Sequence, residues 1–418
     1  MDFSPPEFTK EQEEFAKEVN AWLDENMPEG MTFPRDPLKV SHEQFEKRRE
    51  FARRIGRKGW LYPSHPRKYG GGGLDAAHSA VIMREVAKRG LGLPPFHAAG
   101  AAYGVPVTLA FGTEEQKRSL LPPILRDGAV TWELFTEPEA GSDEANQQTN
   151  ALRHTRDKDY FIVNGTKIFV GGLYSPPDIF LLLTRSDLEA PRHENLAMFL
   201  APANLPGVEI IPLDLFVPGP FGGVSGQSTV GADGIKYQVN FDDVRIHESY
   251  LIGGERDGWK VANAALEVEH AVRQDRGEPR GAFVGASPRN FIAQRFLERC
   301  KNDPNIVKRL KENPQLVDSV VNVYIGAEKE RLYSIRNAGR KGGVYGGTQA
   351  QLYSKVFALT LLHEIAKVLG PYTLTSDDEW GLDDSLFEVG QRGALCLAPM
   401  GTPEITKIVI ARLLSIGR

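Results

Sequence analysis

The first third of the chain has apolar residues at helical spacing. Thr9 and Gln12 form the pattern of a capping box at its start. The apolar face of the helix that follows consists of Phe15, Val19, Trp22 and Leu23. Further helices are expected over 45–55, 74–88, 98–111 and 113–126. We therefore predict an all-helical domain over residues 1–128.

From about residue 129 the pattern changes to short strands. Residues 160–163 and 166–170 flank Asn164-Gly165, a dipeptide typical of a two-residue hairpin turn, so we predict a hairpin there. In the segment 235–241, apolar residues alternate with polar ones, which indicates one buried and one wet face. More strands are expected over 179–185, 196–202 and 207–213. These strands predict a β-barrel or small sandwich over residues 129–246.

Helical spacing returns after residue 246. Helices are predicted over 259–272, 288–300, 316–337, 349–369 and 403–416. Gly370-Pro371 should end one of them sharply. The third part of the chain, residues 247–418, is thus expected to be a helical bundle. The fold class is α+β, with a helical domain, a β-barrel domain and a helical-bundle domain in that order.

Two glycine-rich stretches need a separate interpretation. No strand precedes the run Gly70–Gly73 and no βαβ unit surrounds it, so we reject a phosphate-binding loop and expect a flexible turn. The segment 216–234, rich in glycine and proline, is expected to be a loop.

Composition excludes several classes of function. The net charge of −5 gives no basic footprint for nucleic acid. Cys300 and Cys396 stand far apart, which predicts neither a disulfide framework nor a CxxC metal site. The acidic start lacks the apolar core of a signal peptide, and no run of about 18 apolar residues could cross a bilayer. We expect a soluble, cytoplasmic protein.

The stretch from Thr131 to Val170 combines a ligand-type loop with strands, and four further motifs accompany it. The loop is TEPEAGSD, residues 136–143, and it is followed by NGTKIFVGG (164–172), FDDVRI (241–246), GWKVA (258–262) and GTPEI (401–405). In this order the motifs resemble the acyl-CoA dehydrogenase family. The resemblance covers nearly the whole chain, and the C-terminal half is similar to the large bacterial members.

The resemblance implies a function and its components. It implies α,β-dehydrogenation of an acyl-CoA thioester, with FAD lying between the barrel and the second helical domain. A hydride acceptor is required in any case, because no side chain accepts a hydride. The resemblance also implies an electron-transfer flavoprotein as the electron acceptor and a tetramer, homomeric or mixed, built on the apolar helices of 316–369.

The resemblance also implies the cofactor contacts. Phe135, Thr136 and Ser142 match the family's flavin-contacting loop, and Ser142 is also a substrate contact. Phe169 and Gly171 match a second flavin segment, where the family commonly has Trp and Thr or Ser. Thr402 and Glu404 match a third. Independently of the resemblance, Thr402 can cap a helix with Pro403 at its first position, which leaves N–H groups free for a polar ligand.

The catalytic base departs from the commonest family pattern. Many members have a glutamate before the Gly-Thr of the last motif, whereas this chain has Met400, which we assign to the substrate pocket. The family's alternative position corresponds to Glu269, our predicted base, with Glu267 and His270 as substrate contacts. The competing interpretation is that Glu269 faces solvent or pairs with Arg273.

Other departures concern charge near the ligand. Glu133 and Glu139 replace residues that are usually uncharged, and they would repel an anionic ligand unless they point to water. The family's Arg-x-x-Phe-Gly motif, which reaches the FAD pyrophosphate, is absent from 280–300. Arg289 or Lys367 could take over that role, or the adenosine half could be held differently.

Two other functions fit the same residues. One is a catalytically silent family member that serves as the partner subunit of a mixed tetramer. The other is a flavin monooxygenase or oxidase on the same fold, because a fold does not fix the chemistry.

Overall fold

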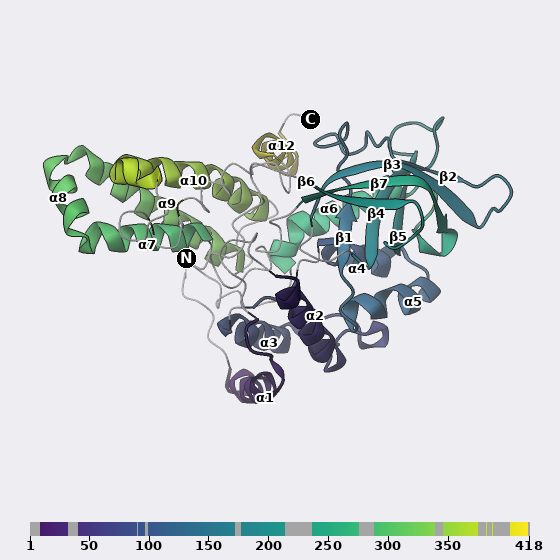
Figure 1. Ribbon diagram of the computed structural model, residues 1–418, viewed down its shortest axis with the longest axis horizontal. Helices are drawn as coiled ribbons and strands as arrows, with labels where there is room; N and C mark the ends of the chain where they lie inside the picture. The colour runs from purple at the N-terminus through teal and green to yellow at the C-terminus, as the bar shows by residue number, and fades with distance from the viewer. Residues whose placement is uncertain are drawn as a thin grey trace.

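The computed structural model describes residues 9–31, 41–89, 91–96, 99–171, 177–213, 236–275, 288–338, 346–374, 382, 387 and 402–416. Its elements form three groups: the N-terminal helices, a β-sheet, and long C-terminal helices that extend away from the sheet (Figure 1). This succession of helices, sheet and helices confirms the predicted fold class. The exact domain limits remain a prediction.

Four of the five N-terminal helices begin within two residues of their predicted starts, and the second begins three residues before its predicted start at 45. The five helices are α1 (Lys10–Asn26), α2 (His42–Arg57), α3 (Ala76–Lys88), α4 (Ala99–Phe111) and α5 (Glu114–Leu125). The capping box of Thr9 and Gln12 is formed, and Thr113 with Gln116 forms a second one at the start of α5. Asp75 caps α3 by accepting a hydrogen bond from the His78 N–H.

The glycine run between α2 and α3 is not the flexible turn that we expected. It follows the short 3₁₀ helix η2 (Arg67–Tyr69) and is bonded along its length to residues 62–67. A Cβ atom on Gly72 would lie 2.2 Å from the Gly59 carbonyl oxygen. The run is therefore glycine because the backbone packs against other backbone, which leaves no room for a side chain.

The middle region forms one mixed sheet in the order β6-β7-β3-β2-β4-β5-β8, with β1 paired to β4. The strands are β1 (Thr131–Leu134), β2 (Asn150–Arg153), β3 (Tyr160–Gly171), β4 (Ile179–Arg185), β5 (Leu196–Pro202), β6 (Val208–Leu213), β7 (Lys236–His247) and β8 (Leu251–Ile252). Between β7 and β8 lies the 3₁₀ helix η4 (Glu248–Tyr250). Within the described ranges the sheet is open, with β6 and β8 at its edges, and does not close into the predicted barrel.

The predicted hairpin at Asn164-Gly165 is wrong, because β3 runs straight through this dipeptide. β3 pairs with β2 on one side and with β7 on the other. Gly165 has φ +144°, and a Cβ there would lie 2.5 Å from the Cα of Thr149. Glycine is needed here because the backbone of β3 closely approaches that of Thr149, directly before β2, and because the register of β3 against β7 shifts at this point. Both features favour glycine, as a tight turn does.

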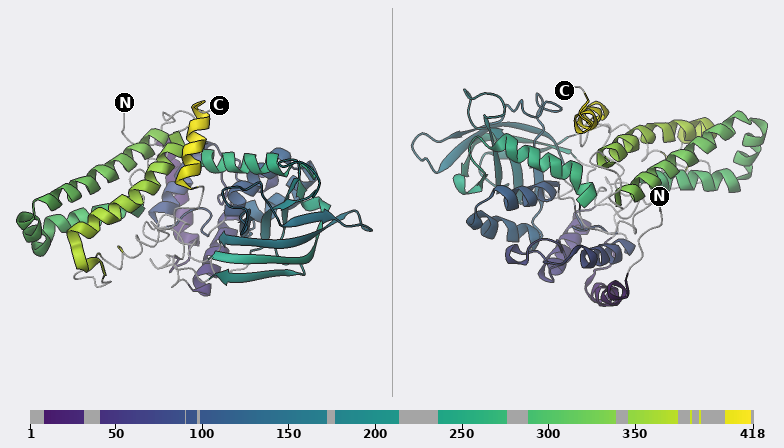
Figure 2. Two further views of the ribbon diagram at one scale, coloured as in Figure 1. Left: turned by 90° about the horizontal axis from the view of Figure 1, so that it is seen from above. Right: turned by 180° about the vertical axis from the view of Figure 1, so that it is seen from behind.

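Helices α4 and α6 (Gly258–Asp275) pack together against the sheet. Val105 of α4, Leu183 of β4 and Val261 of α6 belong to one buried apolar cluster, together with residues of α5 and β5. Figure 2 shows α6 running along the sheet toward the C-terminal helices. This packing fixes the start of α6 relative to the loop between β4 and β5, a relationship on which the site depends.

The C-terminal helices have an apolar core of their own. They are α7 (Pro288–Asn302), α8 (Pro304–Glu312), α9 (Gln315–Ala338), α10 (Gly346–Leu369) and α12 (Pro403–Leu413), with the 3₁₀ helix η6 (Gly370–Leu374) after α10. α10 ends at Leu369, directly before Gly370-Pro371, as predicted, whereas α8 was not predicted. In all three views α12 lies between the long helices and the sheet (Figures 1 and 2).

The described part of the chain has neither a membrane-spanning helix nor a cluster of metal-binding side chains. None of its helices is long and apolar enough to cross a membrane. None of its groups of His, Cys, Asp and Glu has the composition and geometry to hold a metal ion.

Candidate active site

The structure joins the first two predicted cofactor segments. The TEPEAGSD loop leaves β1 at Leu134, and the carbonyl oxygen of Thr136 accepts a hydrogen bond of 2.9 Å from the Ile168 N–H of β3. Phe135 is buried and Thr136 is half-buried. The loop is therefore bonded directly to the strand that carries Phe169 and Gly171.

Phe169 lies in a β-bulge with an unusual backbone conformation. Between Lys167 and Val170 the register of β3 against β7 shifts. Phe169 has φ +57° and its side chain is 52% exposed. A positive φ costs a residue other than glycine on the order of 1–3 kcal/mol, so the surrounding contacts must hold it. The bulge presents an aromatic face to solvent two residues before Gly171.

A buried ion pair lies beneath this loop. The Lys167 ammonium lies 2.6 Å from a Glu137 carboxylate oxygen, and the two side chains are 0% and 2% exposed. The other Glu137 oxygen accepts a hydrogen bond of 2.6 Å from the Gln148 N–H, and the Thr149 N–H also donates to this carboxylate. Gln147 accepts a hydrogen bond from Lys167. Every partner of the ammonium thus comes from residues 135–147 of the preceding loop.

Burial changes the proton affinity of this lysine. Desolvation lowers the pKa of Lys167 to about 8, although the nearby Glu137 carboxylate raises it. We did not predict this cluster from the sequence. The available signal was Lys167 itself, a charged residue within a strand segment that is otherwise largely apolar. It lies in the motif NGTKIFVGG, which we had assigned to cofactor contacts.

The far end of the TEPEAGSD loop is exposed. Ser142 and Glu139 are both exposed, so Glu139 points to water, the orientation that removes the repulsion considered above. Glu133 is half-buried. Next to Ser142, the Asp143 carboxylate forms an ion pair with Arg192 of the β4–β5 loop. This pair connects the loop that carries Ser142 to residues around His193.

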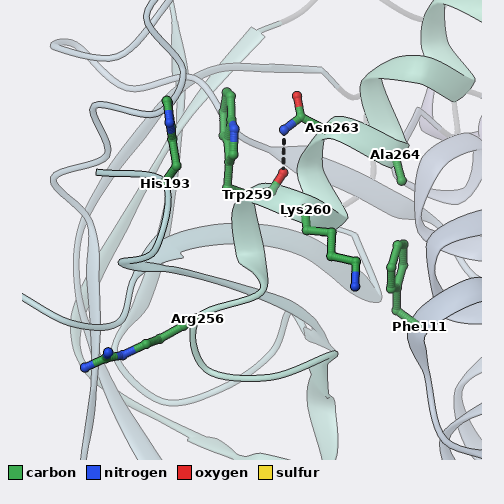
Figure 3. Close-up of a pocket in the computed structure, with 7 residues that line it drawn as sticks. All are labelled: Phe111, His193, Arg256, Trp259, Lys260, Asn263 and Ala264. Carbon is green, nitrogen blue, oxygen red and sulfur yellow. Dashed lines mark hydrogen bonds between the residues drawn. The ribbon is translucent and has the colours of Figure 1, made fainter. Parts of the chain in front are cut away.

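A pocket with a volume of about 480 Å³ lies between the β4–β5 loop and the start of α6. The β4–β5 loop contributes His193, the residue that follows Arg192. The pocket is lined by Phe111, His193, Arg256, Trp259, Lys260, Asn263 and Ala264 (Figure 3). The His193 ring stacks on the Trp259 indole, with ring centroids 4.6 Å apart and planes at 15°. His193 has φ +74°, a second strained residue of this site.

The pocket combines aromatic surface with positive charge. The Lys260 ammonium lies 5.5 Å from the centre of the Phe111 ring. Arg256 points away from the stacked rings in Figure 3 and forms an ion pair with Asp187. Flat rings together with cationic groups suit a ligand that has an aromatic base and phosphates. From the sequence we had selected GWKVA as a motif but had not predicted a pocket at Trp259 and Lys260.

The predicted base and substrate contacts lie farther along α6. Glu267, Glu269 and His270 are all within this helix, as predicted. Position 267 lies one turn beyond Asn263, so the helix leads from the pocket to these residues. Their side chains lie outside the described residues, and so does Met400, so their proposed roles remain predictions.

The start of α12 has the predicted cap. The Thr402 hydroxyl accepts a hydrogen bond of 3.3 Å from the Ile405 N–H, and Pro403 occupies the first position of the helix. The Thr402 side chain is half-buried, while Glu404 is exposed in the first turn. The cap confirms the local structure predicted for this motif and leaves its cofactor role a prediction.

Only one of the two candidates for the missing pyrophosphate contact has a described side chain. The Lys367 ammonium forms an ion pair of 3.0 Å with Glu364 on its own helix. The side chain of Arg289 lies outside the described residues. The Lys367 side chain is 44% exposed, and its ammonium has further N–H donors that a phosphate could use.

Comparison with known families gives two matches in succession. Residues 9–127 match the acyl-CoA dehydrogenase N-terminal domain, and residues 133–216 match the acyl-CoA dehydrogenase middle domain. These matches include α1 to α5 and the strands that hold the TEPEAGSD loop and the bulge. They end before α6.

Curated relatives and solved structures agree with this assignment. Acyl-CoA dehydrogenase IpdE1 of Mycobacterium tuberculosis is 32% identical over 267 residues, 62% of this chain and 63% of that protein, so the similarity spans less than two thirds of the relative. The ChsE4-ChsE5 complex of Mycobacterium tuberculosis has a TM-score of 0.73 at 23% identity, covering 99% of both chains. An acyl-CoA dehydrogenase of Geobacillus kaustophilus has a TM-score of 0.69 at 23% identity, covering 99% of this chain and 100% of that one. The structural likeness extends the shared fold to the C-terminal helices.

Proposed function

The chain belongs to the acyl-CoA dehydrogenase family, and from this premise we propose that it oxidises the α,β-bond of an acyl-CoA thioester with FAD. The observation that carries the proposal is the bonded pair of segments at Thr136 and Ile168, next to the exposed ring of Phe169. The pocket at Trp259 supports a substrate with a nucleotide tail.

FAD is the cofactor of this family, and the groups at the loop and the bulge fit it. Within the described chain, the Thr136 N–H has no hydrogen-bond acceptor, and the hydroxyl beside it is half-buried. Phe169 offers an aromatic face that a flat ring system can contact. We propose that Phe135, Thr136, Ser142, Phe169, Gly171, Thr402 and Glu404 contact the cofactor. When bound, FAD supplies the hydride acceptor that the reaction requires.

We propose that the CoA part of the substrate occupies the pocket at the start of α6. The stacked rings of His193 and Trp259 offer a surface for the adenine, and Lys260 offers a cation for phosphate. The thioester would then extend along α6 toward Glu267 and His270. Ser142 lies next to the Asp143–Arg192 ion pair that flanks this route.

Glu269 is the proposed base. Removal of an acyl α-proton at neutral pH needs a carboxylate within hydrogen-bond reach and donors for the carbonyl oxygen. Met400 cannot take a proton, although its backbone N–H can still donate. Glu269 lies on α6 one turn beyond Ala265, which is buried.

We propose that reduced protein passes its electrons to an electron-transfer flavoprotein in the cytoplasm, and that the chain is part of a tetramer. The exposed face of α9 supports an assembly, because Val317, Val321, Tyr324 and Ile325 form an apolar stripe there. Exposed apolar patches of this kind mark interaction sites. The stripe lies within the region 316–369 that the sequence assigned to assembly.

A second function has an observation in its favour. Met400 replaces the glutamate that acts as the base in many members, as expected for a silent subunit whose partner performs the reaction. Incubation of the FAD-loaded protein with saturated acyl-CoA thioesters and an artificial electron acceptor separates the two functions. Mass spectrometry should detect a thioester lighter by two hydrogens. If the FAD-loaded protein yields no such product from short, long, branched or polycyclic acyl groups, it is a silent subunit.

A further inference from the structure

The carbonyl of Phe135 is held by two buried side chains. It accepts a hydrogen bond of 3.3 Å from the Lys167 ammonium and one of 3.1 Å from the Gln147 amide. Both donors are buried, and Lys167 is itself held by Glu137. The orientation of the peptide group between Phe135 and Thr136 is therefore fixed from inside the domain.

This orientation determines what the loop offers on its other side. In a trans peptide the C=O and the following N–H point in opposite directions. Because the Phe135 carbonyl points to Lys167, the Thr136 N–H points away from the buried cluster. The Thr136 carbonyl is occupied by the Ile168 N–H. Among the described residues, the polar groups of Thr136 that have no hydrogen-bond partner are therefore its N–H and its hydroxyl, and the N–H can only donate.

The same lysine also anchors the second segment. Lys167 precedes the bulge directly, and the strained Phe169 is only two residues farther along β3. The Lys167 ammonium donates to the Phe135 carbonyl, in the loop that carries Thr136. One side chain thus connects the two segments that we assign to the cofactor, and the ion pair with Glu137 leaves little net charge in the cluster.

We propose that Lys167 is a positioning residue for the cofactor: by holding the Phe135 carbonyl it directs the Thr136 N–H toward bound FAD and thereby sets FAD affinity and reduction potential. This inference rests on the proposed use of FAD. Fixed donors aimed at a group that gains negative charge stabilise the charged form more than the neutral one. Reduction adds negative charge to the flavin, so loss of the aimed N–H should weaken the reduced state more than the oxidised state.

The test must separate positioning from folding. Lys167→Met alone leaves the Glu137 carboxylate buried without its partner, a change that can unfold the protein. The double variant Lys167→Met with Glu137→Gln removes both charges together. Gln147→Leu removes the second donor to the same carbonyl and changes no charge. Ile55→Val, in the buried core of the N-terminal helices, is the control for a general loss of stability.

Four readouts are measured on each protein: the melting temperature, the FAD dissociation constant from fluorescence titration of apoprotein, the circular dichroism of bound flavin, and the flavin reduction potential against a reference dye. We expect the double variant to bind FAD about tenfold more weakly, the scale of one hydrogen bond. Its potential should fall and its flavin dichroism should change. Gln147→Leu should weaken FAD binding and lower the reduction potential by smaller amounts. Ile55→Val should change neither the FAD affinity nor the potential.

Three outcomes overturn the proposal, and they differ in meaning. If both cluster variants fold and keep wild-type affinity and potential, Lys167 is only a structural residue and the use of FAD still stands. If a shift in affinity follows the loss of melting temperature equally in Ile55→Val, the effect is stability alone. A wild-type protein that binds no FAD under any condition would instead reject the proposed function, and this inference with it.

Discussion

His193 lies flat against the indole of Trp259, with ring centroids 4.6 Å apart and an angle of 15° between the planes. The two residues come from the β4–β5 loop and from the first turn of α6, which are held together by the packing of α6 on β4 and β5. Their stack forms one wall of the pocket in Figure 3.

Replacing Trp259 tests whether this pocket binds CoA. Trp259→Ala should weaken CoA binding about tenfold, because stacking of a base on an aromatic side chain is worth roughly 1–3 kcal/mol. Trp259→Phe keeps a ring and should lose less. Isothermal titration with CoA measures both. Tyr372→Ala, an exposed aromatic residue outside the pocket, is the matched control. Equal CoA affinity in Trp259→Ala and wild type would place the nucleotide elsewhere.

Glu269→Gln tests the proposed base. The variant should keep its fold and its yellow cofactor, because the change is nearly isosteric. Its rate of flavin reduction by a good substrate should fall about 10²–10⁴-fold, the usual effect of losing a positioned base. Stopped-flow absorbance follows the reduction, with Glu267→Gln as the companion variant. An unchanged rate in Glu269→Gln would favour Glu267 or a base from a partner chain.

Tyr324→Glu tests the assembly surface. Tyr324 is 60% exposed in the middle of the apolar stripe on α9. A charge there should reduce a tetramer to smaller species at micromolar concentration, because burying an unpaired carboxylate is costly. Light scattering after gel filtration gives the mass. Leu188→Glu places the same charge at an exposed apolar residue of the β4–β5 loop and should leave the mass unchanged. A monomeric wild-type protein would contradict the assembly altogether.

The buried lysine predicts a pH dependence of stability. Burial lowers the pKa of Lys167 to about 8, so between pH 8 and the ordinary lysine pKa near 10.4 the unfolded chain binds more protons than the folded one. The cost of burying the ammonium is fully present below pH 8 and is relieved as the pH rises through this window. Wild type should therefore gain stability relative to the double variant of Lys167 and Glu137, by up to about 1.4 kcal/mol per pH unit.

Urea unfolding of both proteins at pH 7.5 and pH 9.5 measures this difference. Comparing the two proteins cancels the titration of groups that they share. A difference in unfolding free energy that stays constant, or that moves against the wild type as the pH rises, would show that the Lys167 pKa is not lowered.

Local signals in the sequence were sufficient for most of the fold. The capping boxes at Thr9 and Thr113 predicted helix starts correctly, because such caps depend only on residues within one turn. The hairpin at Asn164-Gly165 failed for the opposite reason. Its glycine serves a contact with Thr149, a residue that is distant along the chain, and no local pattern distinguishes that contact from a turn.

The candidate site shows the same limit. The motifs at Thr136 and Phe169 were identified from their amino-acid sequence. The sequence could not show that Lys167 connects them, because the partners of a buried charge depend on the tertiary fold. The pocket was missed because four strands, β5 to β8, separate His193 from Trp259 in the sequence. The sequence therefore locates the motifs, whose cofactor roles remain predictions, whereas it does not show the arrangement that links them.

The most direct test of the account is an anaerobic titration of the FAD-loaded protein with acyl-CoA thioesters of different chain length and shape. We predict that at least one of them bleaches the visible absorbance of the flavin, and that the same thioester leaves Glu269→Gln yellow. A protein that holds FAD tightly and keeps its full absorbance with every thioester would contradict the proposed dehydrogenation.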